Sequence, residues 1–185
     1  MRTPGELEPW LHLVALALTA VGAVTDWRKG EIPNWVTLPA IVVAPLVYGL
    51  VGGVSAALFS LVGLLVCSVV PLLLFWRNGM AGGDVKLFAA LGAVGGVYLG
   101  LEAQFLSVVI ASVYALGNLV WSGRILGALG STLFVGLNPV LPRRWRRPIS
   151  NDLLHSIRLG AAILLGTTIA LAGHHPELLR PDLLG

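Results

Sequence analysis

Charged residues, cysteines and long polar stretches are all scarce in this chain, and each scarcity excludes a class of protein. Only 11% of the 185 residues are charged and the mean hydropathy is +0.86, far from the balance of a soluble globular domain. The single cysteine, Cys67, stands within an apolar run, which excludes a disulfide framework and a paired-cysteine zinc site. No stretch is polar enough for a separate soluble domain. The composition therefore predicts one integral-membrane domain over residues 1–185.

Apolar runs separated by short polar breaks predict an all-α membrane protein, a polytopic bundle of about six transmembrane helices. Several runs are shorter than the roughly 20 residues that cross a bilayer core, so flanking tryptophans or local thinning would complete them. Pro39, Pro45, Pro71 and many glycines allow kinks and close helix contacts. The predicted spans are 10–24, 35–51, 56–76, 85–100, 103–121 and 159–172.

The basic residues are distributed unevenly between the two faces of this six-span arrangement. Ten of the twelve fall on one side, whereas only Arg2 and Arg180 fall on the other, and the acidic residues are almost equally divided. By the positive-inside rule the richer side is cytoplasmic, so both termini face outward. The ten cytoplasmic basic residues are Arg28, Lys29, Arg77, Lys86, Arg124, Arg143, Arg144, Arg146, Arg147 and Arg158.

Residues 125–140 form a further apolar stretch with two possible interpretations. As a seventh span it would put arginines on both faces of the membrane, because Arg124 precedes it and a cluster at 143–147 follows. An interfacial segment fits the charge pattern better. The arginine cluster either binds anionic lipid headgroups or serves only to set the topology, and the second interpretation is favoured.

Two polar breaks each carry one aspartate, Asp26 in the break 25–34 and Asp84 in the break 80–86. The chain has only nine acidic residues, and an ionisable group at the end of a membrane helix is costly unless it has a function. The predicted topology places both aspartates on the cytoplasmic face. They are therefore the first candidates for chemistry, although 58 positions separate them.

Two carboxylates within hydrogen-bonding reach repel each other as anions, so the pair holds one proton between them. The ionised member then takes a proton from water, which attacks a peptide carbonyl, while the protonated member stabilises the oxyanion and helps the amine leave. Gly82 and Gly83 lack side chains, so a substrate backbone has room beside Asp84. This is the chemistry of an aspartic protease. The structural alternatives are an ordinary helix N-cap for Asp84 and an ion pair with Arg28 or Lys29 for Asp26.

Helix ends predict which aspartate carries the proton. Asp84 opens a predicted span, where free amides and the positive end of the helix dipole favour an anion. Asp26 closes the first span, where the negative end of the helix dipole disfavours an anion. On this argument Asp84 is the ionised member and Asp26 the protonated one.

The two motifs together resemble the type IV prepilin peptidases, membrane aspartic proteases of the GxGD class. The resemblance rests on Asp26-Trp27-Arg28 followed by Ile32-Pro33-Asn34, and on Gly82-Gly83-Asp84-Val85-Lys86-Leu87 before an apolar helix. It implies that Asp26 and Asp84 are the catalytic pair of an endopeptidase in the bacterial cytoplasmic (inner) membrane. The implied partners are pilin or pseudopilin precursors with a short basic leader, cut at the cytoplasmic surface, typically after glycine.

The chain departs from the family pattern at several points. Ala81 stands where the family has glycine, three residues before the second aspartate, and Arg158-Leu159-Gly160 replaces a family-like Pro-Tyr-Gly. Large bifunctional members carry a cytoplasmic insert with paired cysteines and also methylate the new pilin N-terminus. Here Thr25 leads directly into the first motif. The chain is similar to the short peptidases of tight-adherence (Flp-type) pilus systems, and we expect no methylation and no separate methyltransferase or zinc-binding domain.

Other polar residues near the aspartates are expected to bind substrate or shape the loops. Lys86 and Arg28 are expected to pair with local charges or contact lipid headgroups, or they serve only to set the topology. Asn34, which follows Pro33, either caps the second span or binds substrate. No metal or other cofactor is expected: His12, His155 and the adjacent pair His174-His175 fall in three different segments, and HExxH is absent. Membrane lipid is a further expected partner, and no binding of nucleic acid is expected.

Two alternatives come from other functional classes. A small transporter or proton pathway would place acidic residues along a route across the membrane, but the predicted spans hold almost none away from the inner face, with Glu102 at the opposite boundary. The other alternative is a catalytically inactive membrane protein of pilus assembly.

Overall fold

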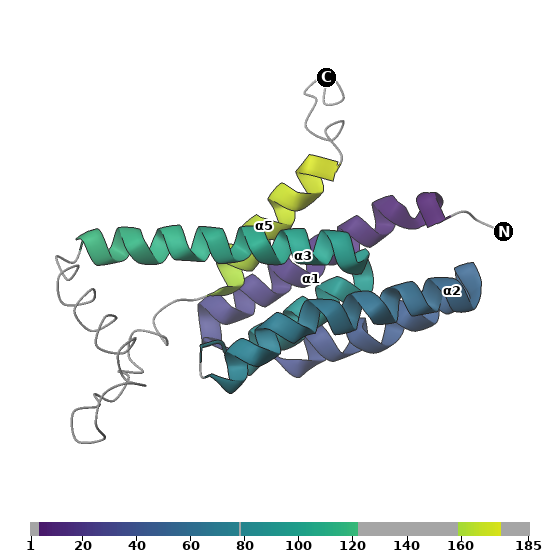
Figure 1. The fold of residues 1–185 in the computed structure, drawn as a ribbon, viewed down its shortest axis with the longest axis horizontal. Helices are drawn as coiled ribbons and strands as arrows, with labels where there is room; N and C mark the ends of the chain where they lie inside the picture. The colour runs from purple at the N-terminus through teal and green to yellow at the C-terminus, as the bar shows by residue number, and fades with distance from the viewer. Residues whose placement is uncertain (1–3, 78, 122–158, 175–185) are drawn as a thin grey trace, which may run out of the picture. The chain divides into compact units, whose positions relative to one another are not determined.

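The computed structural model describes residues 4–77, 79–121 and 159–174, and every regular element within these ranges is a helix. Four helices are assigned: α1 (Pro4–Lys29), α2 (Asn34–Trp76), α3 (Gly82–Trp121) and α5 (Leu159–His174) (Figure 1). Three of them, α1, α2 and α3, are long and apolar enough to cross a membrane. The prediction of an all-α membrane protein is confirmed. The segment 125–140, the arginines of 143–147 and Arg158 lie outside the described residues.

Helix α2 consists of two helical limbs that meet at Gly53. This residue has φ 75° and ψ −167°, a conformation that is essentially restricted to glycine. Figure 1 shows the second limb running back along the first, and the rings of Tyr48 and Phe59 lie with their centroids 6.2 Å apart across the turn. The break falls between the predicted spans 35–51 and 56–76, as the sequence indicated.

Helix α3 is also broken by a glycine, but not where the sequence placed the boundary. The non-helical residue is Gly96, with φ 75° and ψ −174°, inside the predicted span 85–100. The limb from Gly82 to Gly95 is therefore only about 21 Å long at 1.5 Å per residue, less than the roughly 30 Å of a bilayer core. The apolar run continues through the turn, so hydropathy alone did not reveal it. The count of about six transmembrane helices stays a prediction.

The first limb of α3 is the most buried part of the described chain. Every residue from Leu87 to Val94 is buried, and the limb contributes to both hydrophobic core clusters. Its end is held by two hydrogen bonds from α2, Tyr48 Oη to the carbonyl of Val94 (2.8 Å) and Ser60 Oγ to the carbonyl of Ala93 (2.6 Å). These contacts fix the depth of α3, and with it the position of the turn that begins at Gly82.

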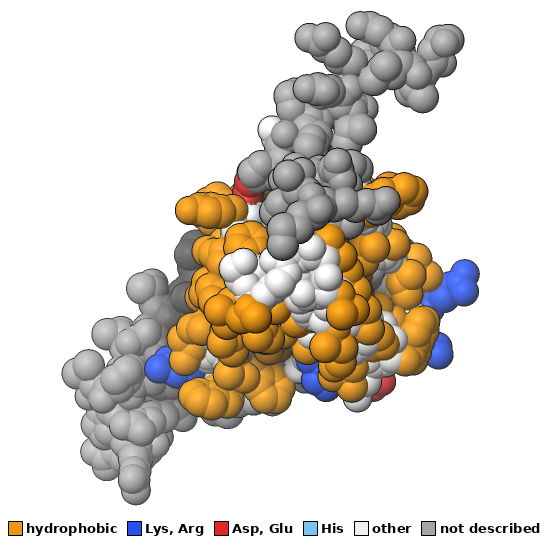
Figure 2. All heavy atoms as spheres, turned by 90° about the vertical axis from the view of Figure 1, so that its right-hand side faces the viewer, with side chains coloured by type: hydrophobic (Ala, Val, Ile, Leu, Met, Phe, Trp, Pro, Cys, Tyr) orange, Lys and Arg blue, Asp and Glu red, His pale blue; other side chains and the backbone are white. Residues whose placement is uncertain are grey.

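The chain divides into two compact units, Met1–Ile110 with Arg158–Gly185, and Ala111–Ile157. The second unit is described only for its first residues, which continue α3 as far as Trp121. Large hydrophobic side chains are exposed along all three long helices, and Figure 2 shows them covering most of the described surface on the face that it draws. Such an apolar exterior suits a lipid environment rather than water.

Candidate active site

The last turn of α1 carries Asp26 into the interior of the protein. Asp26 is only 8% exposed, whereas Trp27, Arg28 and Lys29 after it are exposed. The helix ends at Gly30, which has φ 70° and donates its N–H to the carbonyl of Asp26 at 2.8 Å, the usual glycine termination of a helix. Asp26 is therefore helical, two residues beyond the predicted end of the first span, and its environment differs from that of its basic neighbours.

The first turn of α3 carries Asp84, which is 6% exposed. Its carboxylate accepts a hydrogen bond from the backbone N–H of Ala81, as an acidic residue in the first turn of a helix commonly does. Asp84 thus makes a capping contact, so the structural alternative to catalysis describes part of its role. Ala81 itself is exposed, so its extra methyl group does not crowd the interior.

The two aspartate-bearing segments pack against each other. A methyl group on Gly22, one turn before Asp26, would lie 3.0 Å from Leu87 Cδ2, one turn after Asp84. A methyl group on Gly83 would lie 3.0 Å from the Cβ of Ile32, in the connection after α1. Burial is the largest influence on the carboxyl group of Asp84, and the nearby charge of Asp26 is the next. The structure therefore brings both aspartates to one buried site at the junction of α1 and α3.

Helix α5 supplies a third wall that the sequence did not predict. The backbone N–H of Gly160, in its first turn, donates to Oδ2 of Asp26 at 2.9 Å. Asp26 therefore faces the positive end of α5 as well as lying at the negative end of α1. This contact opposes the effect of α1 on Asp26, and the expectation that Asp26 is the protonated member stays a prediction. The signals in the sequence were a glycine at the start of the last apolar run and its place in the tripeptide 158–160, which departs from a family-like Pro-Tyr-Gly.

The other predicted site residues surround this junction. Lys86 Nζ donates to Asn34 Oδ1 at 2.8 Å, which joins the first turns of α3 and α2. Pro33 is the N-cap of α2, with φ −73° and ψ 147°, and Gly82 and Gly83 are half-buried beside Asp84. Arg28 is exposed at the end of α1. The structure thus brings Lys86 and Asn34 together and keeps Arg28 on the surface.

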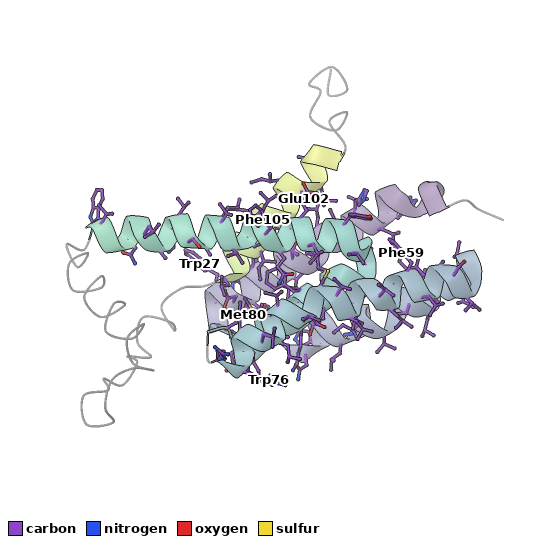
Figure 3. All side chains as sticks on the ribbon, viewed as in Figure 1. Trp27, Phe59, Trp76, Met80, Glu102 and Phe105 are labelled. Carbon is purple, nitrogen blue, oxygen red and sulfur yellow. The ribbon has the colours of Figure 1, made fainter. Side chains whose placement is uncertain are left out.

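Exposed tryptophans mark the end of the molecule that holds the aspartates. Trp27 and Trp35 are each 68% exposed, and Trp76 is 70% exposed. Figure 3 shows Trp27 and Trp76 with Met80 toward the end where α1 and α2 finish and α3 begins, whereas Phe59 lies toward the other end of α2. Tryptophan is enriched where membrane helices reach the headgroup layer, so this end has the character of a membrane interface.

No group of three or more histidine, cysteine, aspartate or glutamate side chains is placed to hold a metal ion within residues 4–77, 79–121 and 159–174. In this part of the chain the buried acidic side chains are Asp26 and Asp84. The arrangement therefore offers two neighbouring carboxyl groups, two backbone N–H donors and two glycines without side chains. Such a set can transfer protons to and from water and a carbonyl group.

Comparison with known proteins gives a family for this chain. Residues 13–116, which include both aspartates, match the model of the type IV leader peptidase family. A curated prepilin leader peptidase/N-methyltransferase of Bacillus subtilis (strain 168) is 34% identical over 122 residues, covering 64% of this chain and 48% of that protein. The chain spans about half the length of this relative, and no solved structure matches. The chain belongs to the type IV leader peptidase family.

Proposed function

We propose that this protein is a membrane aspartic endopeptidase that cleaves the leader from type IV pilin-like precursors, with Asp26 and Asp84 as the catalytic pair. The observation that carries the proposal is the burial of both carboxyl groups at one junction, close enough for the charge of one to act on the other. Both residues lie within the stretch that matches the family. Two buried carboxyl groups whose charges interact favour one shared proton, which supplies a base and an acid.

The reaction follows from this shared proton. The ionised carboxylate accepts a proton from a water molecule as the water oxygen forms a bond to the carbonyl carbon of the scissile peptide. The protonated carboxyl group donates to the carbonyl oxygen, on which negative charge develops. Transfer of a proton to the leaving nitrogen then accompanies cleavage of the C–N bond, which gives a new carboxyl terminus and a free amine. Each aspartate accepts a backbone N–H, Asp26 from Gly160 and Asp84 from Ala81, so either can serve as the base while the other holds the proton.

The surroundings of the pair fit a peptide that emerges from a membrane. Gly82 and Gly83 leave room for an extended backbone beside Asp84. The exposed Trp27, Trp35 and Trp76 support a position at the level of the lipid headgroups, where a basic leader joins a hydrophobic helix. With the excess of basic residues on this side, we place the site at the cytoplasmic face of the bacterial inner membrane and both termini outside.

Methylation of the new N-terminus is not part of the proposal. The relative in Bacillus subtilis is named as both a leader peptidase and an N-methyltransferase. The first motif here follows Thr25 directly, without the paired-cysteine insert that the family resemblance implies for the bifunctional members. We therefore propose a single peptidase domain whose product keeps an unmethylated amine.

The test is to express the full chain with a pilin-like precursor in a strain that lacks its own leader peptidase and to map the N-terminus of the product by mass spectrometry. We expect one cut between the basic leader and the hydrophobic helix, with no added methyl mass. Asp26→Asn and Asp84→Asn should abolish the cut, whereas Glu31→Gln, an exposed acid in the same break as Asp26, should retain it.

The same experiment distinguishes the alternatives. An inactive assembly protein would leave the precursor uncut in every strain, and a transporter would act without cleavage. Cleavage that survives either aspartate substitution in an inserted protein would remove that aspartate from the mechanism.

A further inference from the structure

We propose that Gly160 is a positioning residue for the proposed reaction: its backbone N–H fixes Oδ2 of Asp26, and its missing side chain lets α5 approach close enough to do so. The inference rests on the proposed function and adds a third segment to its site. Gly160 lies outside the matched residues 13–116, in the tripeptide that stands in place of a family-like Pro-Tyr-Gly, and 134 positions from Asp26.

The contact between α5 and Asp26 leaves no space for a side chain at position 160. A methyl group on Gly160 would lie 2.8 Å from both the Cβ and Oδ2 of Asp26, and 3.1 Å from the Cα of Ala23. The Cα of Ala23 is backbone and cannot rotate away, so a larger residue forces α5 and α1 apart or turns the aspartate out of its position. Gly160 is itself buried.

The direction of the hydrogen bond gives the contact a chemical role. The amide of Gly160 donates, so Oδ2 of Asp26 accepts, and the N-terminal end of α5 adds its positive dipole end beside the carboxylate. The interaction orients the carboxyl plane of Asp26 within the pair. Because the carboxylate is already held in one orientation, no free energy is needed to order it as the transition state forms.

A close glycine contact elsewhere on the same helix provides a matched control. A methyl group on Gly166 would lie 2.7 Å from the backbone N of Ser107 and 2.8 Å from the carbonyl O of Ala103 in α3. Gly166→Ala therefore disturbs the packing of α5 as severely as Gly160→Ala does, but at a position about 9 Å further along the helix from Asp26. Gly166→Ala therefore measures the effect of displacing α5 at a position that does not touch the carboxylate of Asp26.

The experiment measures steady-state cleavage of a purified pilin-like precursor by the full chain in detergent or vesicles. For Gly160→Ala we expect kcat to fall about 100-fold, because small displacements of a catalytic group cost about that much, with KM for the precursor within about threefold of the original. For Gly166→Ala, after correction for the folded fraction, kcat should stay within about threefold. Equal loss of kcat in the two variants would overturn the inference, as would an unchanged kcat in Gly160→Ala.

A second variant tests the hydrogen bond without adding atoms. Replacing the Gly160 residue by glycolic acid during translation exchanges its N–H for an ester oxygen and leaves the shape of the helix start unchanged. We expect kcat to fall about 10- to 100-fold, the usual effect of losing one hydrogen bond to a charged group. A kcat equal to that of the unmodified protein would contradict the proposed role even if Gly160→Ala failed to fold.

The outcomes also separate this inference from the proposed function. If the unmodified protein cleaves the precursor and Asp26→Asn does not, the function stands whatever Gly160 does. If the unmodified protein does not cleave, or Asp26→Asn does, the proposed function fails and the role of Gly160 falls with it.

Discussion

The individual residues of the site are placed by short-range features of the chain. Asp26 and Asp84 are buried although their neighbours in sequence include exposed charged side chains. A buried carboxyl group must be compensated by hydrogen bonds or a shared proton, and here each one accepts a backbone N–H, from Gly160 and Ala81 respectively. The site is therefore assembled from main-chain donors as much as from side chains.

The hydrogen bond between Lys86 and Asn34 is expected to stabilise the junction rather than perform chemistry. It joins the first turns of two helices that are 52 positions apart in sequence. In a double-mutant cycle of Lys86→Met and Asn34→Ala, the coupling free energy of unfolding should be about 1 kcal/mol, typical of one hydrogen bond near the surface. Reversible unfolding in mixed detergent measures it.

The cleavage rates of the same variants are the control for this cycle. If the hydrogen bond between Lys86 and Asn34 shapes the segment around Asp84, kcat should fall to a similar extent in both single variants. It should fall no further in the double variant. A coupling energy near zero would show that the contact does not hold the helices together.

The sequence identified the proposed catalytic residues more readily than the contacts that support them. Asp26, Asp84, Lys86 and Asn34 were all identifiable because polar residues stand out in an apolar chain. Gly160 was noted only within a tripeptide that departs from a family-like Pro-Tyr-Gly, because a backbone donor has no distinctive side chain and its partner is 134 residues away. The assignment of the proton did not include the dipole of α5 and stays a prediction.

At the scale of the helices, two glycines with positive φ determine how α2 and α3 are divided. Gly53 lies in open space, whereas a methyl group on Gly96 would meet the ring of Phe59. The sequence located the first break because polar and small residues interrupt the apolar run there. It misplaced the second because Gly95 and Gly96 stand between apolar residues, and only the backbone conformation marks the turn.

Alanine substitutions at these two glycines should have unequal costs. Gly53→Ala should lower the free energy of unfolding by about 1–2 kcal/mol, from backbone strain alone. Gly96→Ala should lower it by about 2–5 kcal/mol, because overpacking against Phe59 adds about 1–3 kcal/mol to the same strain. Unfolding of both variants under the same conditions tests this.

A companion substitution isolates the ring contact. Phe59→Leu should reduce the extra cost of Gly96→Ala and leave the cost of Gly53→Ala unchanged. Equal costs at the two glycines would show that the turn at Gly96 is not held by packing.

At the scale of the whole molecule, the proposed cleavage requires that the helix ends carrying the aspartates face the cytoplasm. The apolar exterior and the three long helices support membrane insertion, and the exposed tryptophans place one interface near the aspartates. The orientation itself rests on the distribution of lysine and arginine. Composition was enough to predict a membrane protein, because mean hydropathy averages over many residues. The position of a turn or of a contact depends on a single residue, which composition does not reveal.

Cysteine labelling tests this orientation. In a Cys67→Ala background, Glu31→Cys lies between α1 and α2, and Ser55→Cys lies just beyond the turn at Gly53; both positions are exposed. We expect a membrane-impermeant maleimide to label position 55 in intact cells and position 31 only after the membrane is opened. Labelling of position 31 in intact cells would reverse the proposed topology.

The central claim is that Asp26 and Asp84 act as one catalytic unit, and the most direct test is the cleavage rate of a pilin-like precursor by Asp26→Asn, Asp84→Asn and the double variant. Groups that act together give strongly non-additive losses. We predict that each single variant falls to the same background rate as the double variant, with all three proteins folded and inserted. Substantial cleavage by either single variant, or a further stepwise loss in the double variant, would contradict the account.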